Sequence, residues 1–262
     1  MHRFLVPTET LAQDNPELPE DARHHLKVLR LKSGEEVELF DGHGSSRRYE
    51  LTTPHLLSPL SSLISSGDSQ FENSPIRKLF PLTLFACITK GSRWDWTIEK
   101  ATELGVTRIV PVISERTIVR IDPADREKKR QRYQRIAEDA SRQSGSLYVP
   151  EIVAPLSFKD SLPLVRETVC FIGALTTPPS PHLLSSLSSL LSPSNSQFEN
   201  SQFENSKISL FIGPEGDFTP AELESLMEIA NPVSFGSTIL RAETAAIYGL
   251  SVIKSYLDVQ SR

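Results

Sequence analysis

Apolar and polar residues alternate with one rhythm at the front of the chain and with another in the rest. The first 50 residues carry short apolar pieces, RFLV, VLRL and EVELFDGHG, with turn-forming residues such as Gly34 and the pair Asp41-Gly42 between or after them. Short alternating pieces bounded by such turns are typical of strands. We therefore expect the front of the chain to form a small β-barrel.

From LTLFACI onward, strand-like apolar runs alternate with helical patterns. LTLFACI precedes a helix expected over 92–104, which Gly105 ends, and RIVPVIS follows. A basic helix is expected after Pro123, and the later runs TVCFIGAL, KISLFIG and VSF are expected to be strands. An amphipathic helix is expected after KISLFIG, and a final helix over 242–257 is expected after VSF. Such alternation predicts an α/β domain in which helices flank a parallel sheet.

Two near-duplicate stretches, 56–74 and 183–206, interrupt these patterns, and the string SQFENS occurs three times in them. Segments so rich in Ser and Asn seldom bury enough surface to offset the entropy lost on ordering. We expect both to be inserted loops, the second extending over 179–206. The expected domains are then 1–78 and 79–262.

The net charge of −5 is distributed unevenly. Residues 1–150 carry 22 Lys and Arg against 21 Asp and Glu, whereas residues 151–262 carry 6 against 12. A nucleic-acid surface would therefore be a local patch in the front part, built from clusters such as Arg23 to Lys32, Arg47-Arg48 and Arg126 to Arg135. Each cluster taken alone is also compatible with an ordinary solvated surface.

Several classes of protein lose support from the sequence. No apolar run reaches the length of a membrane span, and the start of the chain lacks a leader pattern, so we expect a cytoplasmic protein without a membrane partner. Cys87 and Cys170 lie in apolar runs and are expected to be buried small hydrophobes. The adjacent His24 and His25 lack further ligands nearby, so no metal is expected. Motifs of dinucleotide folds, P-loops and common hydrolases are absent.

The segment FIGPEGDFTPAEL at 211–223 joins an apolar run to a helix start. Thr219, Pro220 and Glu222 supply an N-cap, a first-turn proline and the acid of a capping box. Glycines around a rigid proline let the backbone approach a ligand closely, and ligands of parallel sheets gather where strands end. An ordinary connection between a strand and a helix is the competing interpretation.

A second junction of this kind is VSFGSTILRAETAA at 233–246. Gly236 breaks the strand, and Arg241 and Glu243 place charges at the start of the last helix. Because a cation is unfavourable at a helix N-terminus, we expect Arg241 to have a partner, either Glu215, Glu243 or a substrate phosphate.

At these two junctions the chain resembles the ribosomal RNA small-subunit methyltransferase E family, the uridine ring-nitrogen-3 methyltransferases of the SPOUT superfamily. The resemblance extends through VLRLKSGEEVELFDGHG, ITKGSRWDWTIEKATELGVTRIVPVISERTIV and EDASRQSGSLYVPEI, and covers the chain outside the two inserts. It implies an N-terminal PUA-like β-barrel that binds RNA and a C-terminal SPOUT domain with a trefoil knot. It also implies a homodimer that binds S-adenosylmethionine and acts on small-subunit ribosomal RNA or the assembled subunit.

The resemblance also implies which residues form the site. The cofactor pocket is expected to comprise Ala174, Leu175, Gly213, Pro214, Glu215, Gly216, Phe235, Gly236, Ile239, Leu240, Arg241, Thr244 and Ala245. The expected RNA contacts are Arg3, Arg23, Lys27, Arg30, Lys90 and Arg116. The expected catalytic residues are Arg241 and Glu243. Arg241 favours the anionic form of the uracil, and Glu243 or Glu215 orients Arg241.

The chain departs from the family at three positions: Asp217 replaces a second glycine, and Ser146 and Thr238 lie where arginines are usual. Two other functions stay open. The protein could be a SPOUT methyltransferase acting on another RNA, or a non-catalytic RNA-binding assembly factor that has kept the fold. A nucleotide-dependent enzyme with GPEG as its phosphate loop has little support, because no lysine accompanies the loop.

Overall fold

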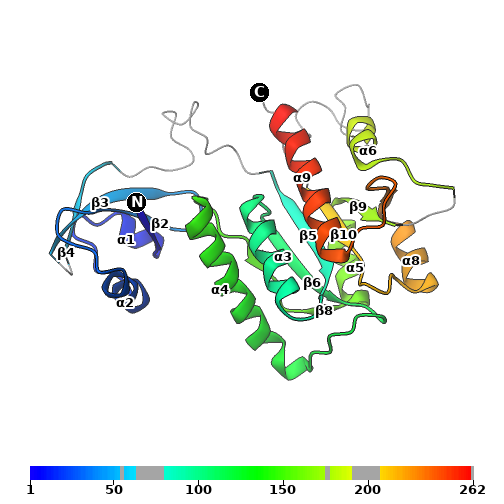
Figure 1. The fold of residues 1–262 in the computed structure, drawn as a ribbon, viewed down its shortest axis with the longest axis horizontal. Helices are drawn as coiled ribbons and strands as arrows, with labels where there is room; N and C mark the ends of the chain where they lie inside the picture. Colours follow the sequence, from blue (N-terminus) through cyan, green and yellow to red (C-terminus); the bar gives the residue numbers. More distant parts are fainter. Residues whose placement is uncertain (54–55, 63–79, 175–177, 191–206, 261–262) are drawn as a thin grey trace. The chain divides into compact units, whose positions relative to one another are not determined.

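The structure is a computed structural model that describes all residues except 54–55, 63–79, 175–177, 191–206 and 261–262 (Figure 1). It separates into two compact units. Unit 1 comprises residues 1–78 and 138–149, and unit 2 comprises residues 79–137 and 150–262. The expected domains differ from these units in the segment 138–149, which groups with the front of the chain.

Unit 1 is built on one four-stranded sheet with the order β1-β2-β3-β4. β1 pairs with β2 in parallel, and β3 pairs with β2 and β4 in antiparallel fashion. Side chains that alternate toward one face, such as Val37, Leu39, Tyr49 and Leu51, form its core. The elements are β1 (His2–Leu5), α1 (Thr8–Leu11), α2 (Glu20–Leu29), β2 (Glu36–Phe40), β3 (Ser46–Thr53) and β4 (Leu56–Pro59).

Two expectations for unit 1 are wrong. VLRL is not a strand, because Val28 and Leu29 form the end of α2, whose buried Ala22 and Leu26 lie four residues apart on one face. The start of the first insert is not a loop, because it forms β4, in which Leu57 pairs with Leu51 of β3 and is fully buried. The rest of that insert lies largely outside the described residues.

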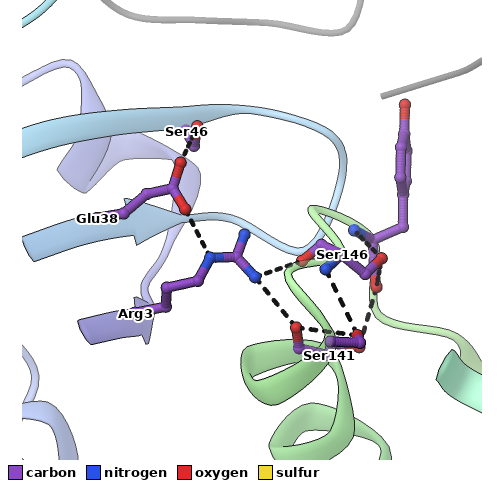
Figure 2. A network of polar contacts seen from close by, with 7 residues as sticks. Arg3, Glu38, Ser46, Ser141 and Ser146 are labelled. Atoms are coloured by element: carbon purple, nitrogen blue, oxygen red, sulfur yellow. Dashed lines mark hydrogen bonds and ion pairs between the residues drawn. The ribbon is translucent and has the colours of Figure 1, made fainter. Parts of the chain in front are cut away.

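Arg3 joins the sheet of unit 1 to the segment 138–149, as Figure 2 shows. Its Nε donates to the Glu38 carboxylate at 2.5 Å, and its Nη1 donates to the carbonyl oxygens of Ser141 and Ser146, both at 3.1 Å. The guanidinium also lies over the Phe40 ring, and only 10% of the side chain is exposed. The donors of Arg3 are thus used inside the unit, and its expected RNA contact stays a prediction.

Unit 2 contains a parallel sheet with the strand order β11-β9-β10-β5-β6-β7, and β8 also pairs with β6. The runs expected to be strands form this sheet, and the residues of β5 and β10 are all buried. The strands are β5 (Leu82–Cys87), β6 (Arg108–Ile113), β7 (Glu151–Ile152), β8 (Leu156–Ser157), β9 (Val169–Gly173), β10 (Ile208–Ile212) and β11 (Asn231–Val233). This confirms the expected α/β fold, with β11 starting before the VSF run.

Helices flank the sheet of unit 2, and α3 packs against α9 (Figure 1). Trp94, Ile98 and Ala101 form the buried face of α3, as the sequence predicted. The helices are α3 (Ser92–Glu103), a 3-10 turn η2 (Pro123–Asp125), α4 (Arg126–Ser144), α5 (Phe158–Arg166), α6 (Leu183–Leu190), α8 (Pro220–Met227) and α9 (Ala242–Gln260). The end of α4 belongs to unit 1.

The second insert is only partly the expected loop. Its first part, LLSSLSSL, forms α6, with Leu183 and Leu187 fully buried one turn apart. Their burial stabilises a helix that serine-rich composition alone does not favour. Residues 191–206 lie outside the described part, and the trefoil knot stays a prediction. Over the described residues, no helix is long and apolar enough to cross a membrane.

Candidate active site

A pocket of about 380 Å³ lies in unit 2 where β9, β10 and β11 end. This is the edge at which parallel sheets commonly bind ligands. Three chain segments that are far apart in sequence line it, together with the start of α9. The lining residues are Gly173, Ala174, Ile212, Gly213, Pro214, Glu215, Asp217, Val233, Ser234, Phe235, Gly236, Thr238, Ile239, Leu240, Arg241, Ala242 and Ala245.

The first wall of the pocket is the turn after β10. The backbone N–H of Asp217 donates to the Pro214 carbonyl at 3.0 Å, and this closes the turn. Thr219 and Glu222 form the expected capping box at the start of α8. A β-carbon on Gly213 would lie 2.9 Å from the Phe218 ring, so the backbone can follow this path only without a side chain there.

The same turn is fixed from outside by residues that follow β6. Arg116 Nη1 donates to the carbonyl oxygens of Gly216 at 3.0 Å and Phe218 at 3.2 Å. The backbone N–H of Glu115 donates to the Glu222 carboxylate at 2.9 Å. Arg116 was expected to contact RNA, whereas the structure gives its guanidinium two acceptors in the turn.

Asp217 adopts a left-handed backbone conformation with a φ of 60°. Glycine enters this region freely, and Asn and Asp are the other residues that tolerate it best. The Asp217 carboxylate also accepts the backbone N–H of Phe218 at 2.8 Å. Aspartate is therefore compatible with the turn, although the resemblance led us to expect glycine at this position.

The second wall of the pocket is the segment after β11. The ring of Phe235 lies so close to Gly173 that a β-carbon there would be 2.3 Å from the ring. The same ring makes an edge contact with Tyr248 at a centroid distance of 5.8 Å, and Tyr248 OH lies 3.0 Å from His182 Nε2. Phe235 is thus held between the end of β9 and helix α9.

Arg93, in the first turn of α3, binds the acids that were expected to orient Arg241. Its guanidinium lies 3.5 Å from the Glu215 carboxylate and 3.9 Å from that of Glu243. Glu243 does not line the pocket, and its Oε2 is buried without a hydrogen-bond partner among the described residues. The structure pairs these acids with a different cation, and the expectation that Glu243 or Glu215 orients Arg241 stays a prediction.

Arg241 itself lines the pocket as an exposed residue. Among the described residues, its side chain has no ion pair or side-chain hydrogen bond. The neighbouring Ile239 is 81% exposed, although it is a large aliphatic side chain. The segment that leads into α9 thus presents one unpaired cation and one uncovered apolar group at the rim of the pocket.

The pocket brings together most residues expected to bind the cofactor. Gly216 and Thr244 do not line it, and Leu175 lies outside the described residues. The other ten do line it: Ala174, Gly213, Pro214, Glu215, Phe235, Gly236, Ile239, Leu240, Arg241 and Ala245. The two turns singled out in the sequence therefore share a single crevice.

The other expected RNA contacts lie on exposed surface. Arg23 and Lys27 lie one turn apart on α2 in unit 1, and Arg30 caps the end of this helix. Lys90 is exposed between β5 and α3 in unit 2. Arg23 also forms a long ion pair of 3.7 Å with Glu17. Their position is compatible with phosphate contacts, which stay a prediction.

Neither metal nor thiol chemistry finds support in the part of the chain that the structure describes. No group of three or more potential ligand side chains is present there. Burial raises the pKa of the Cys87 thiol and of the Cys170 thiol to about 12, so both are protonated at neutral pH. This confirms the expectation that both cysteines are buried small hydrophobes.

Sequence reasoning missed several residues of the site. Arg93 gave no signal, because a basic residue in an early helical turn is ordinary. Gly173 could have been found, since it ends the apolar run TVCFIG as Gly213 ends SLFIG. Ser234 and Thr238 also line the pocket, and Thr238 is one of the positions at which the resemblance led us to expect arginine.

Comparison with known proteins agrees with this geometry. A family model described as an RNA methyltransferase domain matches residues 77–254, and an RNA methyltransferase PUA domain matches residues 18–56. The ribosomal RNA small subunit methyltransferase E of Synechocystis sp. is 30% identical over 259 residues, which are 98% of this chain and 78% of that protein. The protein of the same name from Bacillus subtilis is 28% identical, covering 97% of this chain and 96% of that protein.

Two solved structures share the fold along nearly the whole chain. The ribosomal RNA small subunit methyltransferase E of Neisseria gonorrhoeae, bound to S-adenosyl methionine, has a TM-score of 0.75 with 27% identity, and 98% of each chain is covered. A putative methyltransferase of Legionella pneumophila, in complex with the same cofactor, has a TM-score of 0.78 with 26% identity, and 97% of each chain is covered. The chain therefore belongs to the ribosomal RNA small-subunit methyltransferase E family and is an RNA methyltransferase with the SPOUT fold.

Proposed function

We propose that this methyltransferase uses S-adenosylmethionine to methylate ring nitrogen 3 of one uridine in small-subunit ribosomal RNA. The observation that carries the proposal is the single pocket formed by the turn after β10 and the segment that leads into α9. The names of the relatives support small-subunit ribosomal RNA as the substrate. The resemblance of the sequence supports ring nitrogen 3 as the methylated position.

The residues of the pocket fit this cofactor. Its volume of about 380 Å³ lies within the range of small-molecule sites, roughly 300–1,000 Å³. Ile239 and Leu240 offer apolar surface to an adenine ring, and the absence of a β-carbon at Gly213 lets the backbone approach closely. When bound, the cofactor supplies a methyl group on a positively charged sulfur, for which the carboxylates of Glu215 and Asp217 provide a favourable field.

Arg241 is the residue to which we assign the chemistry on the uridine. Ring nitrogen 3 of a neutral uridine carries a proton, which must leave before or during methylation. A nearby cation lowers the pKa of such a group, because it favours the anionic form. Arg241 is exposed at the pocket and is not paired with a carboxylate, so its charge is available to the substrate.

Arg93 pairs with Glu215, which lines the pocket, and with Glu243, which does not. Its guanidinium faces both Glu215 and Glu243, and Glu243 is 12% exposed. A carboxylate that is paired in this way competes less for Arg241. We therefore assign Arg93 and Glu243 the role of holding the charged groups beside the pocket in place. Arg241 is the one residue to which we assign an action on the base.

The proposal includes the wider organisation of the protein. Residues 1–78 act as an RNA-binding PUA domain and residues 79–262 as the methyltransferase domain, with Arg23 and Lys27 of α2 and its C-cap Arg30 contacting phosphates. The active protein is a homodimer, and the exposed Ile239 is covered when the partner and the substrate are bound. The substrate, naked RNA or the assembled subunit, is found in the cytoplasm.

Mass spectrometry of small-subunit RNA from cells that lack this gene tests the proposal. The proposal requires that one methyl group disappears from one uridine and returns when the gene is restored. Restoration with an Arg241→Ala gene should leave the uridine unmethylated. A complete set of methylated uridines in the deletion strain would contradict the proposed substrate.

A further inference from the structure

Helix α4 carries a concentration of positive charge that the rest of unit 2 does not share. Residues 126–137, the part of α4 that belongs to unit 2, contain six Lys or Arg and one acidic residue. The other residues of unit 2 contain 12 Lys or Arg against 18 Asp or Glu. The helix is therefore a basic element on an otherwise acidic unit.

The inner face of this part of α4 is apolar and packed. Tyr133 and Ala137 are buried one turn apart, and Tyr133 makes an edge contact with Trp94 of α3 at a centroid distance of 5.8 Å. Arg132 ties the helix to α3 through a bidentate pair with Asp95. These contacts fix which side of α4 faces away from α3.

The side of α4 that faces away from α3 is formed by Lys128, Gln131 and Arg135, which we call the outer face. All three are exposed, and their helical spacing sets them opposite Tyr133 and Ala137. The step from Lys128 to Arg135 is seven residues, or about 10 Å along the helix. Two cations at this distance can contact separate phosphates of one RNA strand.

Ion pairing inside the protein leaves the outer face largely uncompensated. Arg130 and Arg132, which lie on the flanks of the helix, pair with Glu127 and with Asp95. Lys128 and Arg135 have no ion pair or side-chain hydrogen bond among the described residues. Surface ion pairs contribute little to stability, so the unpaired cations of the outer face are not explained by a role in folding. Their charge is available to a binding partner.

We infer that the outer face of α4 is a docking surface for the phosphate backbone of the RNA substrate. The inference rests on the proposed function, since it assumes that the protein acts on RNA. It adds a contact surface that lies on the methyltransferase unit itself, separate from the basic residues of α2 in unit 1. Phosphate contacts position a nucleic acid without reading its sequence, so this surface contributes affinity rather than choice of nucleotide.

The test compares two double variants of the full chain. K128Q/R135Q removes the two free cations of the outer face. K159Q/R166Q is the matched control, because Lys159 and Arg166 are also exposed, seven residues apart, on α5 of the same unit. Binding of small-subunit RNA is measured over a range of salt concentrations, and methyl transfer and cofactor affinity are measured separately.

We expect K128Q/R135Q to raise KM for the RNA about tenfold while kcat and the cofactor Kd stay within about twofold. The slope of log affinity against log salt should fall by about 1.4 to 1.8, since each lost phosphate contact removes about 0.7 to 0.9. K159Q/R166Q should behave as the wild type. Equal behaviour of the two variants would overturn the inference.

Two further outcomes distinguish this inference from a protein-binding surface and from a failure of the proposed reaction. If K128Q/R135Q weakens action on assembled subunits but binds naked RNA with the wild-type salt slope, the surface contacts a ribosomal protein and the inference is wrong. If the wild type binds RNA through this surface but methylates no small-subunit uridine, the proposed reaction fails while the surface stands. Melting temperatures of both variants within about 2 °C of the wild type exclude a folding defect.

Discussion

Gly213 offers the sharpest test of the pocket wall, because a single added carbon meets a ring that cannot move away. A β-carbon at this position would lie 2.9 Å from Phe218 Cε2 and 3.2 Å from Cδ2. Phe218 is 4% exposed and packs against the rings of Phe158 and Phe211 at centroid distances of 5.8 and 5.6 Å. Gly213→Ala must therefore shift the turn or distort the aromatic cluster.

The cost of such overpacking is about 1 to 3 kcal/mol. If the side chains of the aromatic cluster are displaced, the melting temperature falls by about 2–4 °C for each kcal/mol of lost stability. If the turn yields instead, the pocket changes shape, and the same free energy weakens cofactor binding by about 5- to 150-fold. Differential scanning fluorimetry and titration calorimetry with S-adenosylmethionine measure the two effects on one preparation.

Gly216→Ala is the matched control in the same turn. A β-carbon there would lie 3.5 Å from Arg116 Cβ, an ordinary contact, and the backbone of Gly216 does not adopt a positive φ. We expect this variant to keep its melting temperature and its cofactor affinity. If Gly213→Ala proves as harmless as Gly216→Ala, the described packing of the turn against Phe218 is wrong.

Four further predictions follow from the site. Arg241→Ala should bind S-adenosylmethionine within about twofold of the wild type but methylate at least about a hundredfold more slowly, a loss of about 2.7 kcal/mol of transition-state stabilisation, because it removes the cation beside the base. Arg116→Ala should weaken cofactor binding about 5- to 30-fold, because the carbonyls of Gly216 and Phe218 lose a charged donor worth about 1–2 kcal/mol at this exposed position, while leaving RNA affinity unchanged. Asp217→Gly should preserve the melting temperature, whereas Asp217→Val should cost about 1–3 kcal/mol in chemical denaturation, because a β-branched residue is strained at a φ of 60°. Cys87 and Cys170 should resist iodoacetamide at pH 8 until the protein is unfolded, because burial raises the pKa of each thiol from 9.0 to about 12 and cuts the thiolate fraction steeply.

Each of these predictions has a result that would count against it. Wild-type turnover by Arg241→Ala would remove Arg241 from the chemistry. A loss of RNA affinity, with normal cofactor affinity, in Arg116→Ala would restore its expected RNA contact. Equal stability of the two Asp217 variants would show that the turn is not left-handed in solution, and rapid alkylation of both thiols in the folded protein would contradict their burial.

The architecture of unit 2 could be predicted because its local signals agree with one another. LTLFACI and KISLFIG are apolar throughout and become the two fully buried neighbours β5 and β10. The capping box of Thr219 and Glu222 also forms as the sequence indicated. Where periodicity, turn residues and caps all point to one element, sequence and structure coincide.

The failures arise where long-range contacts decide the outcome. Leu57 and Leu187 lie in serine-rich stretches, yet Leu57 belongs to the buried core cluster that includes Phe4 and Val37, and α6, which carries Leu187, packs on α9. Arg3 was expected to contact RNA, but its acceptors Ser141 and Ser146 lie more than 130 positions away. The composition of a segment does not indicate which distant residues it will contact.

The pairing of charges at the site was unpredictable for the same reason. The sequence places Glu243 two positions from Arg241, and proximity along the chain favoured a pair between them. In the structure Glu243 faces Arg93, which comes from α3 and is 150 positions away in the sequence. The two residues at the start of α9 project differently, so only the fold determines which cation each acid meets.

The most direct test of the account is reconstitution with purified components. Small subunits from cells lacking the gene are incubated with the purified protein and S-adenosylmethionine, and the RNA is then digested to nucleosides for mass spectrometry. The account predicts one 3-methyluridine per subunit with the wild type and none with Arg241→Ala. A methyl group on any other base or ring position, or no transfer by a protein that binds the cofactor in calorimetry, would contradict it.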